Sequence, residues 1–186
     1  MGLTRLALDF FQPVSERGMT AVEEMESQVV NLLSFQPISK TVFGTQIGFN
    51  MLSAYGEESA ERLSDVRARI VAEVQRYLAG RLVMPAISVV QAPVFYSLTF
   101  SAYAEFQAPP ELNALTERLA ASGLKLTPAG EEPPTNVSVV GEECPVLGTP
   151  ERDPSIANGV WLWGAADNLR VPAKAAVAIA EKLLAS

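Results

Sequence analysis

The strict alternation of residues 98–106 constrains the fold more than any other feature of this sequence. It lies within an aromatic and β-branched run over residues 90–107. A period of two predicts a half-buried β-strand with one apolar side facing a core. Pro93 cannot donate a hydrogen bond to a neighbouring strand, so it predicts a bend or a sheet edge. The apolar side carries Leu98, Phe100, Ala102, Ala104 and Phe106, and the opposite side carries Thr99, Ser101, Tyr103 and Glu105.

Other patterns predict the elements around this strand. Thr20 with Glu23 forms a capping-box signature, and helical spacing of apolar residues follows to about Leu33. A second amphipathic helix begins near Leu63 and ends before Gly80, with Asp65 and Arg69 as an i,i+4 ion pair. A third helix follows two prolines at 109–110, and a fourth begins at Pro172. Extended segments are predicted at 4–11, 43–52, 84–93, 97–107, 137–140, 144–148 and 159–166.

The order of these elements predicts a single α+β domain over residues 1–186. Because strands 84–93 and 97–107 are adjacent in sequence, we expect a mixed, largely antiparallel sheet with helices on one face.

Composition excludes several classes of function. The net charge of -7 argues against nucleic-acid binding, and the absence of histidine removes histidine-based catalysis and histidine metal sites. The spacing of the acidic residues fits no metal loop, so no metal is expected. No apolar run approaches the ~20 residues of a membrane span, and no signal peptide is evident, so we expect a cytoplasmic protein.

The single cysteine and a row of arginines are both predicted to be structural. Cys144 is the single cysteine, and Glu142 and Glu143 precede it, which disfavours the thiolate. An arginine row recurs every seven residues from Arg62 to Arg76 and includes Arg69. Such rows are more often solvated helix faces than anion sites.

Four stretches together point to a family: FQPVSERG, FGTQIGFNML, QAPVFYSLTF and RDPSIANGVWLWGAADNLR. In this order they resemble the C-terminal dimerisation domain of aspartate-semialdehyde dehydrogenases. The family's other half carries a dinucleotide-binding domain with a glycine-rich loop and the nucleophilic cysteine. No GxGxxG motif occurs here.

The resemblance assigns site positions. Gln91 stands where the family has an arginine that binds the substrate carboxylate, and Leu98 stands where it has the acid–base histidine. Val66 takes the place of a substrate-binding glutamate, whereas Arg69 and Gln12 keep a cation and a glutamine beside the substrate. An amide cannot form the bidentate ion pair and leucine cannot transfer a proton, so we expect no catalytic residue.

The resemblance also bears on cofactors. Asn168 is the one candidate cofactor contact, and the VPAKAA segment soon after it departs from the family's pattern. We therefore expect no cofactor in this chain, although the family's full-length enzymes use NADP.

The side of the sheet without helices is expected to be a dimer interface. Its candidate residues are Tyr96, Thr99, Ser101, Tyr103, Trp161 and Trp163. The sequence thus predicts a homodimerisation domain with a degenerate active site. Its candidate partners are a second copy of itself and an upstream dinucleotide-binding domain.

Two alternatives stay open. The chain is the C-terminal half of an active NAD(P)-dependent semialdehyde dehydrogenase or acyl-phosphate reductase of amino-acid biosynthesis, with Tyr96 or Glu105 as the acid. Otherwise the pocket around Gln12 and Arg69 senses a small acidic ligand.

Overall fold

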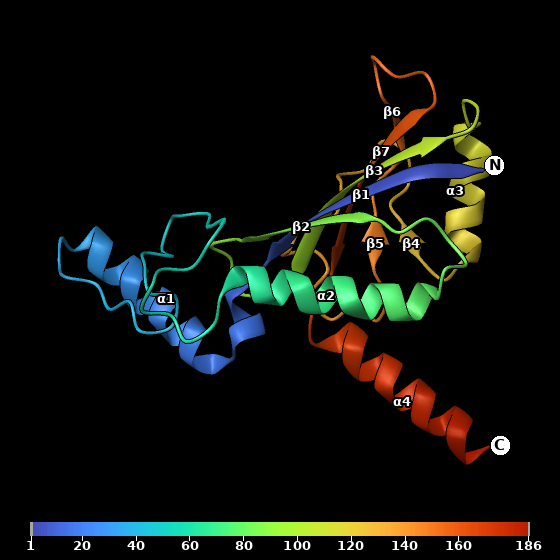
Figure 1. The fold of residues 1–186 in the computed structure, drawn as a ribbon. Coiled ribbons are helices and arrows are strands. Elements are labelled where there is room, and N and C mark those ends of the chain that lie inside the picture. Colours follow the sequence, from blue (N-terminus) through green and yellow to red (C-terminus); the bar gives the residue numbers. More distant parts are fainter. Residues whose placement is uncertain (1, 186) are drawn as a thin grey trace.

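A seven-stranded mixed sheet forms the body of the molecule, as the computed structural model, which describes residues 2–185, shows (Figure 1). The central strand is β3 (Leu98–Phe106), the alternating segment. Its antiparallel neighbours are β1 (Leu3–Gln12) and β7 (Gly159–Ala166). The sheet is completed by β2 (Ala86–Gln91), β4 (Lys125–Leu126), β5 (Val146–Leu147) and β6 (Glu151–Arg152). The α+β class and the mixed, mostly antiparallel sheet are confirmed.

The place of β1 is the main topological finding. β1 lies between β2 and β3, pairing parallel with β2 and antiparallel with β3. The expectation that sequence neighbours 84–93 and 97–107 lie side by side is therefore wrong. A parallel pair needs a long crossover connection, and residues 13–85 supply it.

Two helices cover one face of the sheet. Helix α2 (Leu63–Leu78) packs Leu63 and Val66 on Val89 of β2. Helix α3 (Leu112–Ala121) packs Leu115 on Ala104 and Phe106 of β3 and on Val160 of β7. Burying these apolar side chains, each worth about 1.5–3 kcal/mol, fixes which side of the alternating strand faces inward.

Helix α1 (Met19–Leu33) packs on the loop that follows it and not on the sheet. It lies beyond one end of the sheet (Figure 1). Its Val22 and Met25 share a core with Phe43, Ile47 and Leu52. The expected strand at 43–52 is wrong, since that segment is turns with a single β-bridge from Leu52 to Gln91. The expected capping box is also wrong, because Gly18 occupies the N-cap and no side chain caps the helix.

A fully buried amide organises that loop. Gln28 Nε2 donates hydrogen bonds to the carbonyls of Ser39 and Thr45 at 2.6 and 3.3 Å. Gln28 Oε1 accepts from the N–H groups of Ile47 and Gly48 at 2.7 and 3.0 Å. One side chain therefore satisfies four backbone groups, which explains how the segment stays folded without a strand.

The remaining segments differ from expectation in part. Residues 137–140 form a turn instead of a strand, with Val139 buried against Val146 and Ala165. Helix α4 (Arg170–Leu184) projects from the sheet and buries none of its residues (Figure 1). Among the described residues, no helix has the length and apolarity that crossing a membrane would require.

The connection from β2 to β3 stores backbone strain. Ser97, which is 1% exposed, has φ of 69°, and its Oγ has no hydrogen-bond partner in the described part of the chain. A non-glycine residue in this left-handed region costs about 1–2 kcal/mol.

Replacing Gln28 with alanine should lower the free energy of unfolding by about 3–5 kcal/mol, because four buried backbone groups lose their partner. Urea denaturation followed by circular dichroism measures the effect. Gln36→Ala, at an exposed position, should change stability by less than about 0.5 kcal/mol. Equal effects of the two substitutions would contradict the organising role of Gln28.

Ser97→Gly should raise the free energy of unfolding by about 1 kcal/mol, because glycine tolerates positive φ and the unpartnered hydroxyl is removed. The matched control Ser88→Gly, in strand β2, should instead lower it by about 0.5–1 kcal/mol. A loss of stability in Ser97→Gly would show that the serine is not strained.

Candidate functional site

Gln91 is the best-connected residue among the positions singled out by sequence. Its side chain is fully buried, with Oε1 accepting from the Tyr55 hydroxyl at 2.9 Å and Nε2 donating to the Gln12 carbonyl at 2.8 Å. Its backbone makes two further hydrogen bonds with Leu52. A side chain that is fully buried and hydrogen-bonded through both its oxygen and its nitrogen holds the ends of β1 and β2 together.

An ion-pair cluster of Arg17, Glu61 and Arg69 adjoins Tyr55. The Arg17 guanidinium lies 4.9 Å from the Tyr55 ring centroid, and Arg17 Nη1 lies 2.9 Å from Glu61 Oε2. The other carboxylate oxygen of Glu61 pairs with Arg69 at 2.5 Å. Burial raises the pKa of Tyr55, while the nearby Arg17 opposes that rise.

Arg69 therefore has a different partner from the one expected. The predicted Asp65–Arg69 pair is not formed, because the guanidinium turns to Glu61 in the preceding loop. The hydrogen bond and the charge of Glu61 raise the pKa of Arg69, whose side chain is 62% exposed. An exposed, already paired arginine gives little affinity for a further anion.

Val66 and Leu98 both face the covered side of the sheet. Val66 is buried in the core between α2 and β2. Leu98 lines a cavity of about 240 Å³ together with Phe10, Gln12, Glu16, Ile70 and Val89. Gln12 and Leu98 were expected at one site, and both line this cavity. Arg69, which was expected beside Gln12, does not line it.

Asn168 joins three segments. Its Oδ1 accepts from the Ser97 N–H at 2.9 Å, and its Nδ2 donates to Ser15 Oγ at 3.1 Å and to Glu16 Oε1 at 3.0 Å. It thus ties the 3-10 turn η1 (Val14–Arg17) to the start of β3. Its amide is occupied by these contacts, and a role toward a cofactor stays a prediction.

The face opposite α2 and α3 carries the aromatic residues expected at an interface. We call this side of β3 and β7 the open face; it comprises Thr99, Ser101, Tyr103, Trp161 and Trp163, which the strand registers place together. Trp161 and Trp163 are 41% and 38% exposed, and Tyr103 packs on Trp161 at a centroid distance of 4.8 Å. Glu105, at one end, pairs with Arg5 at 3.1 Å.

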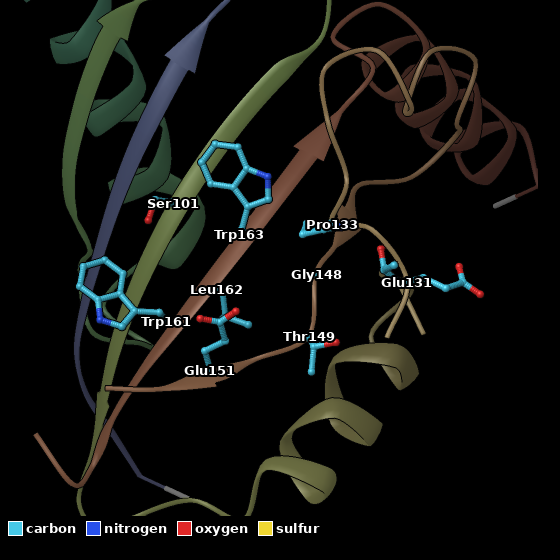
Figure 2. Close-up of a pocket in the computed structure, with 10 residues that line it drawn as sticks. Ser101, Glu131, Pro133, Gly148, Thr149, Glu151, Trp161, Leu162 and Trp163 are labelled. Carbon is cyan, nitrogen blue, oxygen red and sulfur yellow. The ribbon is translucent and has the colours of Figure 1, made fainter. Parts of the chain in front are cut away.

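A hollow of about 490 Å³ lies on the open face. Figure 2 shows the indoles of Trp161 and Trp163 on its strand side, with Thr149 and Glu131 across from them. The indole N–H groups are already used, by Asp153 Oδ2 and by the Pro134 carbonyl, both at 2.7 Å. These bonds fix both rings as rigid apolar surfaces.

An apolar groove continues the open face toward α1. Two adjoining hollows, of about 480 and 390 Å³, share Pro93, Val94 and Asn136. One reaches Trp163 and Met51, and the other reaches Tyr96, which is 39% exposed. Sequence reasoning missed Phe49 and Val137 here, although both are exposed and apolar.

Other candidate groups are structural or unconnected. Cys144 is a free, partly exposed thiol outside all these sites. Glu105 lies on the open face, on the opposite side of the sheet from Leu98, because the two alternate along β3. No cluster of metal-ligating residues occurs within residues 2–185.

Comparison with known proteins identifies the family. The family model described as "Semialdehyde dehydrogenase, dimerisation domain" matches residues 1–171. A USG-1 protein homolog of Pseudomonas aeruginosa is 32% identical over 161 residues, which cover 84% of this chain and 47% of that protein. An aspartate-semialdehyde dehydrogenase of a Shewanella species is 30% identical over 98% of this chain and 55% of its own length.

Solved structures agree with the sequence matches. A probable aspartate-semialdehyde dehydrogenase from Pseudomonas aeruginosa superposes with a TM-score of 0.85 at 31% identity, over 98% of this chain and 55% of that chain. The chain thus spans about half the length of these relatives. It belongs to the semialdehyde dehydrogenase family and corresponds to the dimerisation domain of that family.

Proposed function

We propose that this chain is a homodimerisation domain that associates through its open face. The observation that carries the proposal is the pair of partly exposed tryptophans, Trp161 and Trp163, on a sheet face that α2 and α3 leave uncovered. Contiguous exposed aromatic and apolar surface of this kind marks a protein interface. The apolar groove extends it, so that two copies can bury the area of about 2,000 Å² or more that is typical of obligate dimers.

We further propose that the domain is not catalytic. Gln91, at the family's substrate-arginine position, is buried and saturated with hydrogen bonds, and Val66, at the glutamate position, is core. Leu98 cannot transfer a proton, and Glu105 is on the far face of the sheet. Glu16 is the one ionisable residue among the six that line the cavity beside Leu98, and its carboxylate already accepts a hydrogen bond from Asn168, which supports the non-catalytic proposal.

A second partner is proposed for helix α4. The helix buries none of its residues, and Pro172, Ala176 and Ile179 recur along one side of it. A 15-residue helix is marginally stable by itself in water, so an apolar side of this length favours a packed partner. The partner we propose is a dinucleotide-binding domain, in line with the half of the relatives that this chain does not span.

The first test is the oligomeric state. The 20.0 kDa chain should give a dimer of twice that mass by native mass spectrometry and by light scattering. Ser101→Arg should weaken the dimer by at least ~100-fold, because it buries an unpaired charge at the centre of the open face. Ser64→Arg, at an exposed position of α2, should leave the dimer unchanged. A monomeric unmodified chain would remove the basis of the proposal.

The second test is activity. The full gene product should show no phosphate-dependent, NADP-linked oxidation of aspartate semialdehyde above a blank reaction. The expected reason is that Leu98 cannot transfer a proton and that Glu16, the one ionisable residue lining the cavity beside it, is bonded to Asn168. Turnover that disappears on mutation of a residue of this chain would overturn the non-catalytic proposal while leaving dimerisation untouched.

A further inference from the structure

We infer that the free edge of strand β2 is a docking site for the C-terminal end of an extended peptide, whose carboxylate Arg62 and Arg67 bind. Strand β2 lies at one end of the sheet and pairs with β1 alone, apart from a single bridge to Leu52. Helix α2 runs alongside it (Figure 1). Addition of a strand to such an edge is a recurring mode of peptide recognition, because backbone hydrogen bonds hold the peptide.

Backbone groups along this edge are unpaired. Gln91 exchanges both of its backbone hydrogen bonds with Leu52, at 3.0 and 2.9 Å, whereas the N–H of the next residue, Ala92, donates to β1. Successive residues of a strand direct their backbone groups to opposite sides, so Ile87 and Val89 direct theirs away from β1, as Gln91 does. Among the described residues, none outside the β1–β2 pair bonds to the backbone of Ile87 or Val89.

The edge also lacks the protection that exposed edges usually have. Proteins commonly block an edge strand with charged side chains, a bulge or a covering loop. Residues 82–91 contain no charged side chain. Pro85 precedes β2 and Leu52 closes the other end at Gln91, so the open stretch is confined to residues 86–89. An edge that is open over so short a length fits the end of a peptide better than a second sheet.

A cationic cavity lies at the closed end of this edge. It has a volume of about 240 Å³ and lies between Val89 of β2, the start of α2 and the loop before it. Arg62 and Arg67 are the charged residues that line it, with hydroxyl groups from Ser53 and Ser64. Neither guanidinium has a hydrogen-bond or ion-pair partner in the part of the chain that the structure describes. A carboxylate placed here meets two unpaired arginines and no competing carboxylate on the cavity wall.

The closed end decides which end of a peptide fits. Because Leu52 occupies the edge beyond Val89, a segment that pairs with β2 has to stop beside the cavity. A segment parallel to β2 stops there with its C-terminal carboxylate, next to Arg62 and Arg67. An antiparallel segment would start there with its ammonium group, which the two arginines repel. The charge of the cavity therefore selects a free C-terminus and the parallel direction.

A labelled peptide tests the inference on the intact chain. The probe alternates threonine and valine, which favour extended backbone, over about six residues and carries a fluorophore at its N-terminus. Fluorescence anisotropy at pH 7 measures its binding. The free acid should bind with Kd on the order of 100 µM. The same peptide with a C-terminal amide should bind at least ~10-fold more weakly, because it carries no charge for the arginines.

A matched pair of variants locates the carboxylate. Arg67→Gln should weaken binding of the free acid at least ~10-fold and leave binding of the amide unchanged. The control Arg76→Gln removes an arginine from the other end of α2 and should bind both peptides normally. Both side chains are exposed, so neither substitution should prevent folding.

Backbone pairing is tested by methylating the peptide nitrogens one residue at a time. Only alternate N–H groups of an added strand face β2, so methylation should weaken binding ~10-fold at alternate residues and have little effect at those between them. Such an alternation distinguishes strand addition from binding through the carboxylate alone.

The inference is overturned by the absence of saturable binding, by equal binding of acid and amide, or by equal losses in Arg67→Gln and Arg76→Gln. Methylation without an alternating effect overturns it as well. None of these results bears on dimerisation, because the free edge of β2 lies apart from the open face on β3 and β7.

Discussion

The hydrogen bonds of Gln91 are the constraint on which the site region depends. Its side chain joins Tyr55 to the end of β1, and its backbone bridges to Leu52, so three segments far apart in sequence meet at one buried amide. An arginine at this position would bury a charge where the amide now bonds to Tyr55 and to the Gln12 carbonyl, and burying a charge costs several kcal/mol of desolvation.

The two faces of the sheet divide the functions of the molecule. Helices α2 and α3 pack apolar side chains on the covered face, and one of the cavities left there is lined by Leu98 and Gln12. The open face keeps its aromatic residues in contact with solvent, held rigid by bonds to Asp153 and Pro134. Rigid aromatic side chains lose little conformational entropy on association, which makes such a face suited to a permanent contact.

The sequence predicted the elements whose signal is local. The alternation of β3, the tryptophan strand β7 and the amphipathic helix α2 were found within a few residues of their ends. The segment 43–52 was not, because buried side chains of α1 shape it: Gln28 holds Ile47, and Glu24 accepts from the N–H of Val42 at 2.7 Å. The insertion of β1 between β2 and β3 depends on long-range pairing, which periodicity does not encode.

At the candidate site, too, the sequence identifies the residues but does not predict how they are arranged in space. In the sequence, Gln91 and Leu98 appear as altered family positions, and Gln12 appears as a retained one. The structure places them differently. Gln91 is buried and hydrogen-bonded, whereas Gln12 lines a cavity, and its buried Oε1 has no hydrogen-bond partner among the described residues. Because the Gln12 carbonyl accepts a hydrogen bond from Gln91, the Gln91 amide also fixes the end of β1 that carries the Gln12 side chain. Gln91 and Gln12 thus belong to a single hydrogen-bonded arrangement at the paired ends of β1 and β2.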